Sequence, residues 1–185
     1  MYYCTAAMEL KKVKIPEGFL EALPQGIKYI RKNHKDFLVI DEIYCSDGHN
    51  LKADYVQIHG EPSIRIDVDI RGERGSFFID AFWGSYAKLY SFIPKIEENR
   101  IIIQAFCPLC GINLMTRDFC EEEGCGTEEH VELFLPGTEN RILVCARLGC
   151  PGHKVYIYDV PVQMNRTISE INYFGAQIDD IFKGI

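Results

Sequence analysis

The sequence predicts an α+β fold, in which an antiparallel β-sheet has short flanking helices and an inserted cysteine-rich module. Three observations support this fold class. The 185 residues are 47% hydrophobic and 12% aromatic, which is enough apolar material for a folded core. Residues 64–71 alternate strictly between apolar and charged side chains, a pattern typical of a strand with one buried face. Six of the eight cysteines lie between Cys107 and Cys150.

Helices are expected near both ends of the chain. Pro16 can open a short helix, and Pro24 should interrupt it before a second helical piece over residues 27–30. Near the other end, Thr167 and Glu170 have the spacing of a capping box. The residues that follow them form an apolar stripe with helical spacing, which predicts a closing helix.

The remaining elements are expected to be strands. Residues 72–75 supply a turn after the alternating strand, and residues 76–83 should return beside it as a hairpin. A further β run over residues 100–106 leads directly into Cys107, so the first cysteine pair should extend from a sheet strand. Downstream, the sequence predicts a second hairpin and one more strand, over residues 131–135, 141–145 and 154–160.

These elements divide the chain into three parts. Residues 1–106 are expected to form an α+β body, residues 107–153 a metal-binding module, and residues 154–185 a closing strand and helix packed on the body. The formal charge of the chain is −7, and the module contains eight acidic but only three basic side chains. Because phosphates are bound by clustered lysine and arginine, this balance disfavours nucleic-acid binding, although the N-terminal segment is locally basic.

The strongest motif is a pair of cysteines, Cys107 and Cys110, followed by Gly111. Two intervening residues let both sulfur atoms converge on one metal ion, and the glycine allows a tight backbone turn beside it. Nine residues then lead to Cys120 and Cys125, which is enough for a short hairpin that brings the second pair to the same ion.

Residues 107–126 therefore resemble a zinc ribbon, a small β-hairpin fold in which two cysteine pairs clamp one zinc. The resemblance implies a closed site formed by Cys107, Cys110, Cys120 and Cys125. The second pair departs from the commonest ribbon pattern, because four residues rather than two separate its cysteines.

A second cluster lies downstream, in Cys145, Cys150 and His153. Cys145 and Cys150 have the same four-residue gap as Cys120 and Cys125, with a glycine before the second cysteine and a histidine soon after. This likeness suggests a short internal repeat. We expect these three residues to bind a second zinc, and four candidates remain open for its last ligand, namely His130, Cys45, His49 and water.

Other arrangements are also consistent with the spacing. One zinc bound by Cys107, Cys110, Cys145 and Cys150 would leave Cys120 and Cys125 without a metal. We favour two zinc ions over one, and zinc over an iron–sulfur cluster, because hairpin-spaced cysteine pairs with nearby histidines suit a closed tetrahedral ion. Iron in a four-cysteine site remains an alternative.

The sequence contains no export signal and no apolar run long enough to span a membrane, so we expect a cytoplasmic protein with reduced thiols and no membrane partner. The favoured function is a zinc-binding protein of open biological role, whose structural zinc supports a protein-interaction or regulatory surface. Enzymatic activity is left open but disfavoured; it would use a zinc-bound water, or Cys45 with Asp47 and His49 as nucleophile, orienting group and base. A nucleic-acid-binding ribbon is the remaining alternative.

Overall fold

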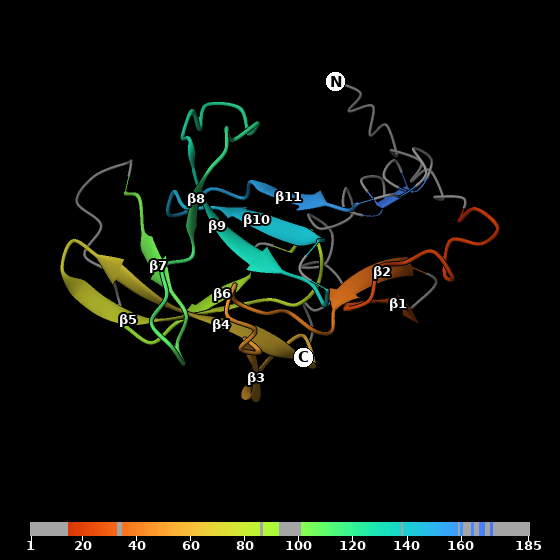
Figure 1. Cartoon of the computed structure of the whole chain (residues 1–185), viewed down its shortest axis with the longest axis horizontal. Helices are drawn as coiled ribbons and strands as arrows, with labels where there is room; N and C mark the ends of the chain where they lie inside the picture. The colour runs from red at the N-terminus through yellow and green to blue at the C-terminus, as the bar shows by residue number, and fades with distance from the viewer. Residues whose placement is uncertain are drawn as a thin grey trace, which may run out of the picture.

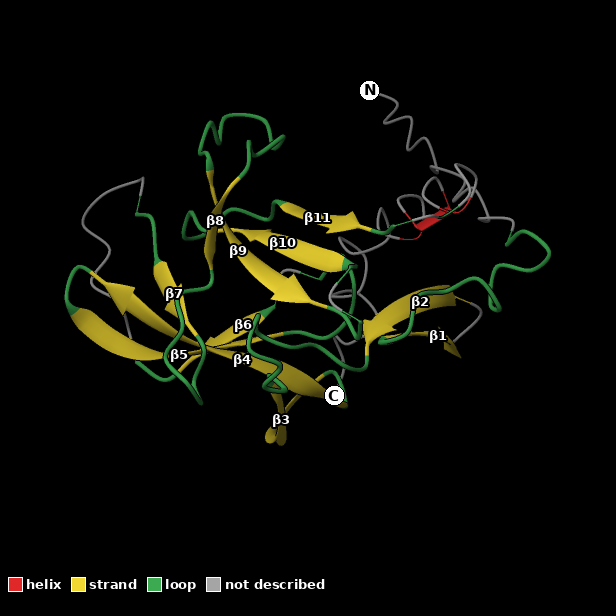
Figure 2. Ribbon diagram, in the orientation of Figure 1, coloured by secondary structure: helices red, strands yellow, loops and turns green. Residues whose placement is uncertain are grey.

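The computed structural model describes most of the chain between residues 15 and 160. The described residues are 15–32, 35–85, 87–92, 101–137, 139–158 and 160, together with the single positions 164, 167, 168 and 171. Within them the structure has eleven strands and no helix longer than isolated residues (Figures 1 and 2).

The largest sheet has five antiparallel strands in the order β3-β4-β5-β6, with β7 paired beside β3 on the same edge of β4. The turn between β4 and β5 is formed by Arg71 and Gly72, whose φ angles are 53° and 88°. A two-residue hairpin turn with positive φ at both positions matches the right-handed twist of the strands. The five strands are β3 (Lys52–Ile58), β4 (Glu61–Ile70), β5 (Glu73–Ile79), β6 (Lys88–Tyr90) and β7 (Gln104–Phe106).

The second sheet has four antiparallel strands in the order β11-β10-β9-β8. It contains the predicted downstream hairpin, in which Arg141 of β10 pairs with Phe134 of β9. A separate two-stranded sheet precedes both larger sheets along the chain. These strands are β8 (Met115–Arg117), β9 (Glu129–Phe134), β10 (Arg141–Cys145) and β11 (His153–Tyr156), and the two-stranded sheet is β1 (Ile27–Lys32) with β2 (Lys35–Ile40).

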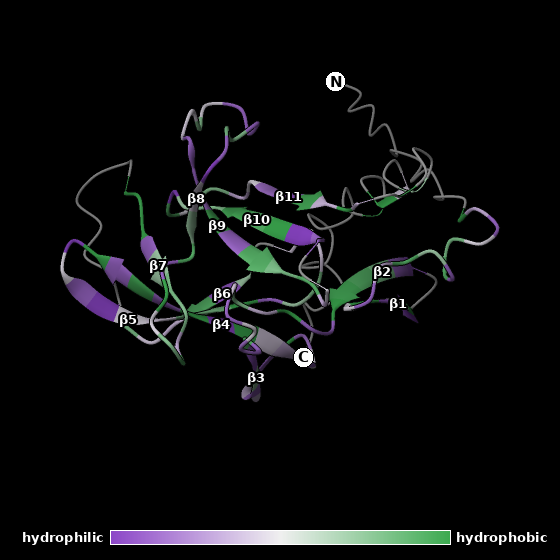
Figure 3. Cartoon of the chain, in the orientation of Figure 1, coloured by the Kyte–Doolittle hydropathy of each residue, from purple (hydrophilic) through white to green (hydrophobic). Residues whose placement is uncertain are grey.

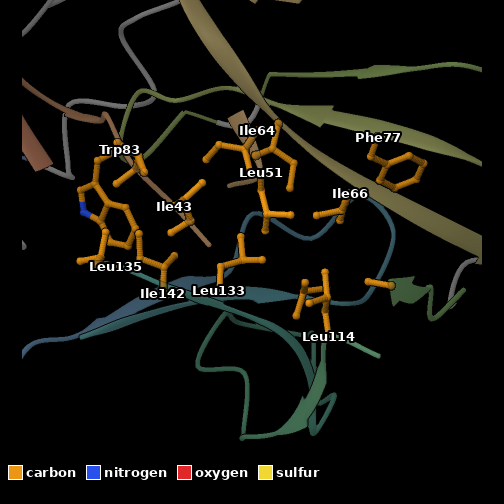
Figure 4. Close-up of a cluster of buried hydrophobic side chains, with 14 of the residues drawn as sticks. Ile43, Leu51, Ile64, Ile66, Phe77, Trp83, Leu114, Leu133, Leu135 and Ile142 are labelled. Carbon is orange, nitrogen blue, oxygen red and sulfur yellow. The ribbon is translucent and has the colours of Figure 1, made fainter. Parts of the chain in front are cut away.

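One hydrophobic core joins the two larger sheets. Figure 4 shows Ile64 and Ile66 of β4 on one side of this core and Leu133 and Ile142 of β9 and β10 on the other. Ile66 and Leu133 are each only 1% exposed, and burial of such a side chain contributes about 1.5–3 kcal/mol. In Figure 3 the apolar colour covers much of β2, β9 and β10, whereas the outer end of the β4–β5 hairpin is hydrophilic.

Backbone hydrogen bonds outside the regular strands also tie the sheets together. Tyr44, in the loop after β2, exchanges two backbone hydrogen bonds with Phe134 at the end of β9, at 2.8 and 2.9 Å. The Ile103 N–H, just before β7, donates to the Ala146 carbonyl just after β10, at 2.9 Å. The loops that carry the cysteines are therefore anchored at their bases by hydrogen bonds between the sheets.

The expected α+β class is wrong, because the described part of the chain is nearly all β. Residues 17–23 form turns rather than a helix, and the segment expected as a second helical piece is strand β1. Gly26 adopts a φ of 89°, which breaks any helix there, and the β-branched and aromatic residues after it pair with β2 instead. Local apolar spacing was compatible with either structure, and pairing with a neighbouring strand decided it.

The predicted closing helix lies almost entirely outside the described residues. Three apolar positions of this segment, Met164, Ile168 and Ile171, are buried in the main core. No helix in the described part of the chain is long and apolar enough to cross a bilayer.

Candidate metal centres

The structure gathers eight potential ligands into two groups of four. We name them by their outermost residues, so the 45–110 group consists of Cys45, His49, Cys107 and Cys110, and the 120–150 group consists of Cys120, Cys125, Cys145 and Cys150. Within each group the ligand atoms all lie within 4.8 Å of one another. Each group has the number and type of ligands that a closed tetrahedral zinc site requires.

The 45–110 group is built from two different half-sites. Cys45 and His49 lie in the loop between β2 and β3, where the Gly48 N–H donates to the Cys45 carbonyl at 2.9 Å and closes a tight turn. Cys107 and Cys110 follow β7, and the Gly111 N–H donates to the Cys107 carbonyl, also at 2.9 Å. Gly48 and Gly111 have φ angles of 81° and 73°, which explains the glycine in each turn.

Distances in the 45–110 group fit a shared metal ion. The Cys45 Sγ lies 3.5 Å from His49 Nδ1 and 4.0 Å from Cys110 Sγ. A tetrahedral zinc with bonds of about 2.3 Å to sulfur and 2.0–2.1 Å to nitrogen separates its ligand atoms by roughly 3.5–3.8 Å. Cys45 and Cys107 are buried and Cys110 is exposed, so one side of this group is open to solvent.

The 120–150 group is more regular and more enclosed. Two Sγ–Sγ distances, Cys120 to Cys150 and Cys125 to Cys145, are both 3.7 Å. This value is too long for a disulfide bond and close to the spacing of two thiolates on one tetrahedral zinc. All four cysteines are buried and contact one another as a cluster separate from the hydrophobic core.

The two cysteine pairs of the 120–150 group have the same backbone hydrogen bonds. Cys125 N–H donates to the Glu122 carbonyl at 3.0 Å, and Cys150 N–H donates to the Arg147 carbonyl at 3.1 Å. The first cysteine of each pair donates to the carbonyl seven residues later, Cys120 to Thr127 and Cys145 to Gly152, at 2.9 and 2.8 Å. The repeat suggested by the sequence is therefore a repeat of local geometry, in which each first cysteine faces the second cysteine of the other pair.

The protonation of the thiols shows why these groups suit a cation. In the 120–150 group, burial raises the pKa of Cys150 to about 11 and also raises the pKa of Cys145. Burial likewise acts to raise the pKa of Cys125, but hydrogen bonds from the Thr127 backbone and nearby side chains outweigh it and lower the pKa to about 7. The Cys145 and Cys150 thiols must therefore lose their protons before they can bind a cation together with Cys125.

The same pattern occurs in the 45–110 group. Burial opposes ionisation of Cys107, but backbone N–H groups of Cys110 and Leu109 outweigh it and lower the Cys107 pKa. For Cys110, a backbone hydrogen bond from Ile112 favours the thiolate, while desolvation and the neighbouring Cys107 oppose it and raise the pKa to about 11. Each group therefore contains at least one thiol that a metal ion must deprotonate.

The structure divides the predicted site residues differently from the sequence. Cys107 and Cys110 do not lie with Cys120 and Cys125; they lie with Cys45 and His49, whereas Cys120 and Cys125 lie with Cys145 and Cys150. All six predicted cysteines belong to a group, and the Cys45–His49 loop, which the sequence offered as one source of a missing ligand, supplies two ligands to one group. The alternative set of Cys107, Cys110, Cys145 and Cys150 is not brought together either.

The candidate histidines downstream lie outside both groups. The His153 ring packs edge-on against Trp83, with ring centroids 4.6 Å apart, and its Nδ1 hydrogen-bonds the Pro151 carbonyl at 2.9 Å. His130 is fully buried on β9, opposite Cys145 of β10. Asp47, the orienting group of the hypothetical catalytic set, is exposed, while Cys45 and His49 face the other ligands of their group.

One signal in the sequence could have identified the grouping that the structure has. Cys120–Cys125 and Cys145–Cys150 share a four-residue gap and a glycine before the second cysteine, and similar half-sites pair with each other. The two remaining short motifs, Cys45–His49 and Cys107–Cys110, then form the other group.

Comparison of the chain with family models, curated protein sequences and solved structures finds no match.

Proposed function

We propose that this chain is a two-zinc protein in which both ions are structural and cross-link loops of the β framework. One observation carries the proposal: two separate groups each offer four ligand atoms, at spacings that fit a tetrahedral zinc. Four protein ligands fill the coordination sphere and leave no position for a reactive water, which favours a structural role over a catalytic one.

Each ion would join segments that are far apart in the sequence. An ion in the 45–110 group ties the loop between β2 and β3 to the segment after β7, across 65 residues between Cys45 and Cys110. An ion in the 120–150 group ties the loop between β8 and β9 to the turn between β10 and β11. Because the bound ion joins loops that lie outside the regular strands, its binding free energy contributes directly to folding.

The ligand types favour zinc over other metals. Thiolate-rich sites with a histidine or with four cysteines in tetrahedral arrangement are typical of zinc, and iron in a four-cysteine site is the competing ion. The two ions are distinguishable by colour, because zinc is spectroscopically silent and ferric thiolate sites absorb visible light.

The surface beside the 120–150 group supports a protein partner. Phe119, immediately before Cys120, is 59% exposed, and Glu121, Glu122 and Glu123 beside it are exposed acidic side chains. An acidic surface with an exposed aromatic side chain repels phosphate backbones and suits a protein segment better than nucleic acid. Retention of the zinc-loaded protein on single- or double-stranded nucleic acid at low salt would contradict this part of the proposal.

The decisive experiment counts metal ions in matched histidine variants. Protein purified without added metal should contain two zinc ions per chain by elemental analysis and native mass spectrometry. His49→Ala should reduce this number to one, because His49 belongs to the 45–110 group, whereas His153→Ala should retain two. One ion in the unmodified protein, or loss of an ion in His153→Ala but not in His49→Ala, would overturn the proposal.

A further inference from the structure

Lys88 connects the five-stranded sheet with the 120–150 group. It lies on β6, paired with Ile79 of β5, so its backbone belongs to a different sheet from the cysteines of this group. Its side chain nevertheless lines a hollow of about 220 Å³ together with Cys150, Gly149 and Pro151. A lysine of one sheet therefore shares a hollow with the metal-binding turn of the other sheet.

The electrostatic surroundings of Lys88 are unusual for a lysine. Lys88 is partly buried, and Cys145 and Cys150 are the charged groups that act on its ammonium group. Among the described residues no carboxylate forms an ion pair with Lys88, whereas Lys28 pairs with both Asp41 and Glu61. Asp80 lines a cavity with Lys88, but its carboxylate is hydrogen-bonded to the His59 ring, with 2.6 Å between Asp80 Oδ2 and His59 Nδ1.

A zinc ion bound by four thiolates has a formal charge of −2. Burying that charge is costly unless cations or hydrogen-bond donors lie nearby. The Gly152 N–H donates to Cys150 Sγ at 3.4 Å, and Arg147 donates to the carbonyls of Gly124 and Cys125 at 2.9 and 3.4 Å. Arg147, just after β10, also acts on the Cys125 thiol, and Lys88 lines the hollow beside Cys150 from the opposing sheet.

We propose that Lys88 is the counter-ion of the zinc site in the 120–150 group and that it couples metal binding to the packing of the two larger sheets. This inference rests on the proposed function, because it requires an ion bound by the four cysteines. The ammonium group stabilises the anionic zinc–thiolate centre, and the centre in turn supplies the negative partner that Lys88 needs at this position. Lys88 is thus a positioning residue rather than a ligand.

The test compares Lys88→Met with Lys88→Arg and with Lys28→Met. Lys88→Met keeps the length of the side chain but removes its charge, and Lys88→Arg restores a charge. Lys28→Met removes a partly buried lysine from β1 that is ion-paired elsewhere. Zinc affinities are measured by competition with a chromophoric chelator, and the thiolate-to-cobalt charge-transfer bands are recorded after replacement of zinc by Co²⁺.

Lys88→Met should weaken one of the two zinc sites by about tenfold, the lower end of the effect seen when groups that support metal ligands are removed. Its cobalt charge-transfer bands should move to longer wavelength, because thiolates without a nearby cation give up electron density more easily. Lys88→Arg should recover most of both properties, and Lys28→Met should change neither. A loss of folding stability alone would not shift these bands.

Unchanged affinity and an unchanged cobalt spectrum in Lys88→Met would overturn the inference while leaving the two-zinc proposal intact. Equal effects in Lys88→Met and Lys28→Met would also overturn it, because the effect would then come from general destabilisation. If the unmodified protein binds fewer than two ions, the proposed function fails first, and the stoichiometry measurement identifies that case separately.

Discussion

The two candidate metal centres differ in how their ligands are assembled. The 45–110 group combines two unlike half-sites that are 65 residues apart between Cys45 and Cys110, includes a histidine, and exposes Cys110. The 120–150 group combines two half-sites of the same design, separated by 20 residues between Cys125 and Cys145, and buries all four cysteines. Similar half-sites meet within one sheet, whereas unlike half-sites meet between distant segments.

Because of this difference, we expect the two metal ions to contribute unequally to the free energy of folding. A metal at the 120–150 group would join the loop before β9 to the turn after β10, and β9 and β10 are the two central strands of the four-stranded sheet. A metal at the 45–110 group would bind beside the solvent-exposed Cys110, so its loss should disturb less of the buried structure.

The largest effect is expected from removal of a buried ligand of the 120–150 group. Cys145→Ala should eliminate one zinc ion and cost several kcal/mol of unfolding free energy, a substantial part of the roughly 10 kcal/mol or more that structural zinc contributes in zinc-finger peptides. Elemental analysis and denaturant unfolding measure the two quantities. Cys110→Ala is the comparison variant; it should lose the other zinc ion with a smaller loss of stability, and equal losses would contradict the assigned contrast.

The second prediction concerns the pH dependence of zinc binding. In the 120–150 group two thiols, Cys145 and Cys150, have raised pKa values. In the 45–110 group one thiol, Cys110, has a pKa that is shown to be raised. The useful window is between about pH 8 and 10. It lies above the Cys125 pKa of about 7 and below the Cys110 and Cys150 pKa values of about 11. In this window the thiols with raised pKa values still hold protons, which zinc must displace. Since proton competition weakens as pH rises, both affinities should increase with pH.

The 120–150 group should release one more of these protons than the 45–110 group. Its zinc affinity should therefore rise about tenfold more steeply per pH unit. Calorimetric titrations in buffers of different ionisation enthalpy count the released protons, and variants with a single intact site, such as His49→Ala, assign the counts. Equal slopes for the two sites would mean that both release the same number of protons, which would contradict this prediction.

The smallest effects are expected from two glycines of the 120–150 group. A Cβ at Gly152 would lie 2.6 Å from Cys120 Sγ and 3.3 Å from Cys145 Cβ, so Gly152→Ala should cost about 1–3 kcal/mol and weaken zinc binding at this group. A Cβ at Gly149 would meet open space, but its φ of 80° strains any other residue, so Gly149→Ala should cost about 1 kcal/mol. Zinc affinity and thermal unfolding separate the two outcomes.

The control for this pair is Gly60→Ala, which has a similar φ of 85° and open space in a hairpin turn away from the cysteines. It should match Gly149→Ala in stability and leave zinc affinity unchanged. If Gly152→Ala binds zinc as tightly as Gly60→Ala does, the close packing of the backbone around Cys120 is not required for the site.

Part of the fold was predictable from local patterns. The alternation over residues 64–71 predicted β4, and the two apolar runs around residues 136–140 predicted the β9–β10 hairpin, because both patterns specify which face of a strand is buried. The second expected N-terminal helix was wrong because the short apolar run after Gly26 suits a helix or a strand equally, and pairing with β2 decided between them. The first was wrong because residues 17–23 form turns.

The sequence by itself determined the half-sites. Cysteines with two or four residues between them, beside glycines that permit a tight turn, lie close enough in space to bind one metal ion. Only the tertiary structure decided which half-sites face each other. Cys107 and Cys110 lie nearer along the chain to Cys120 than to Cys45, but the hydrogen bonds of Tyr44 to Phe134 and of Ile103 to Ala146 bring the β2–β3 loop beside β7. Spacing along the chain limits each pair, and the packing of the two sheets selects its partner.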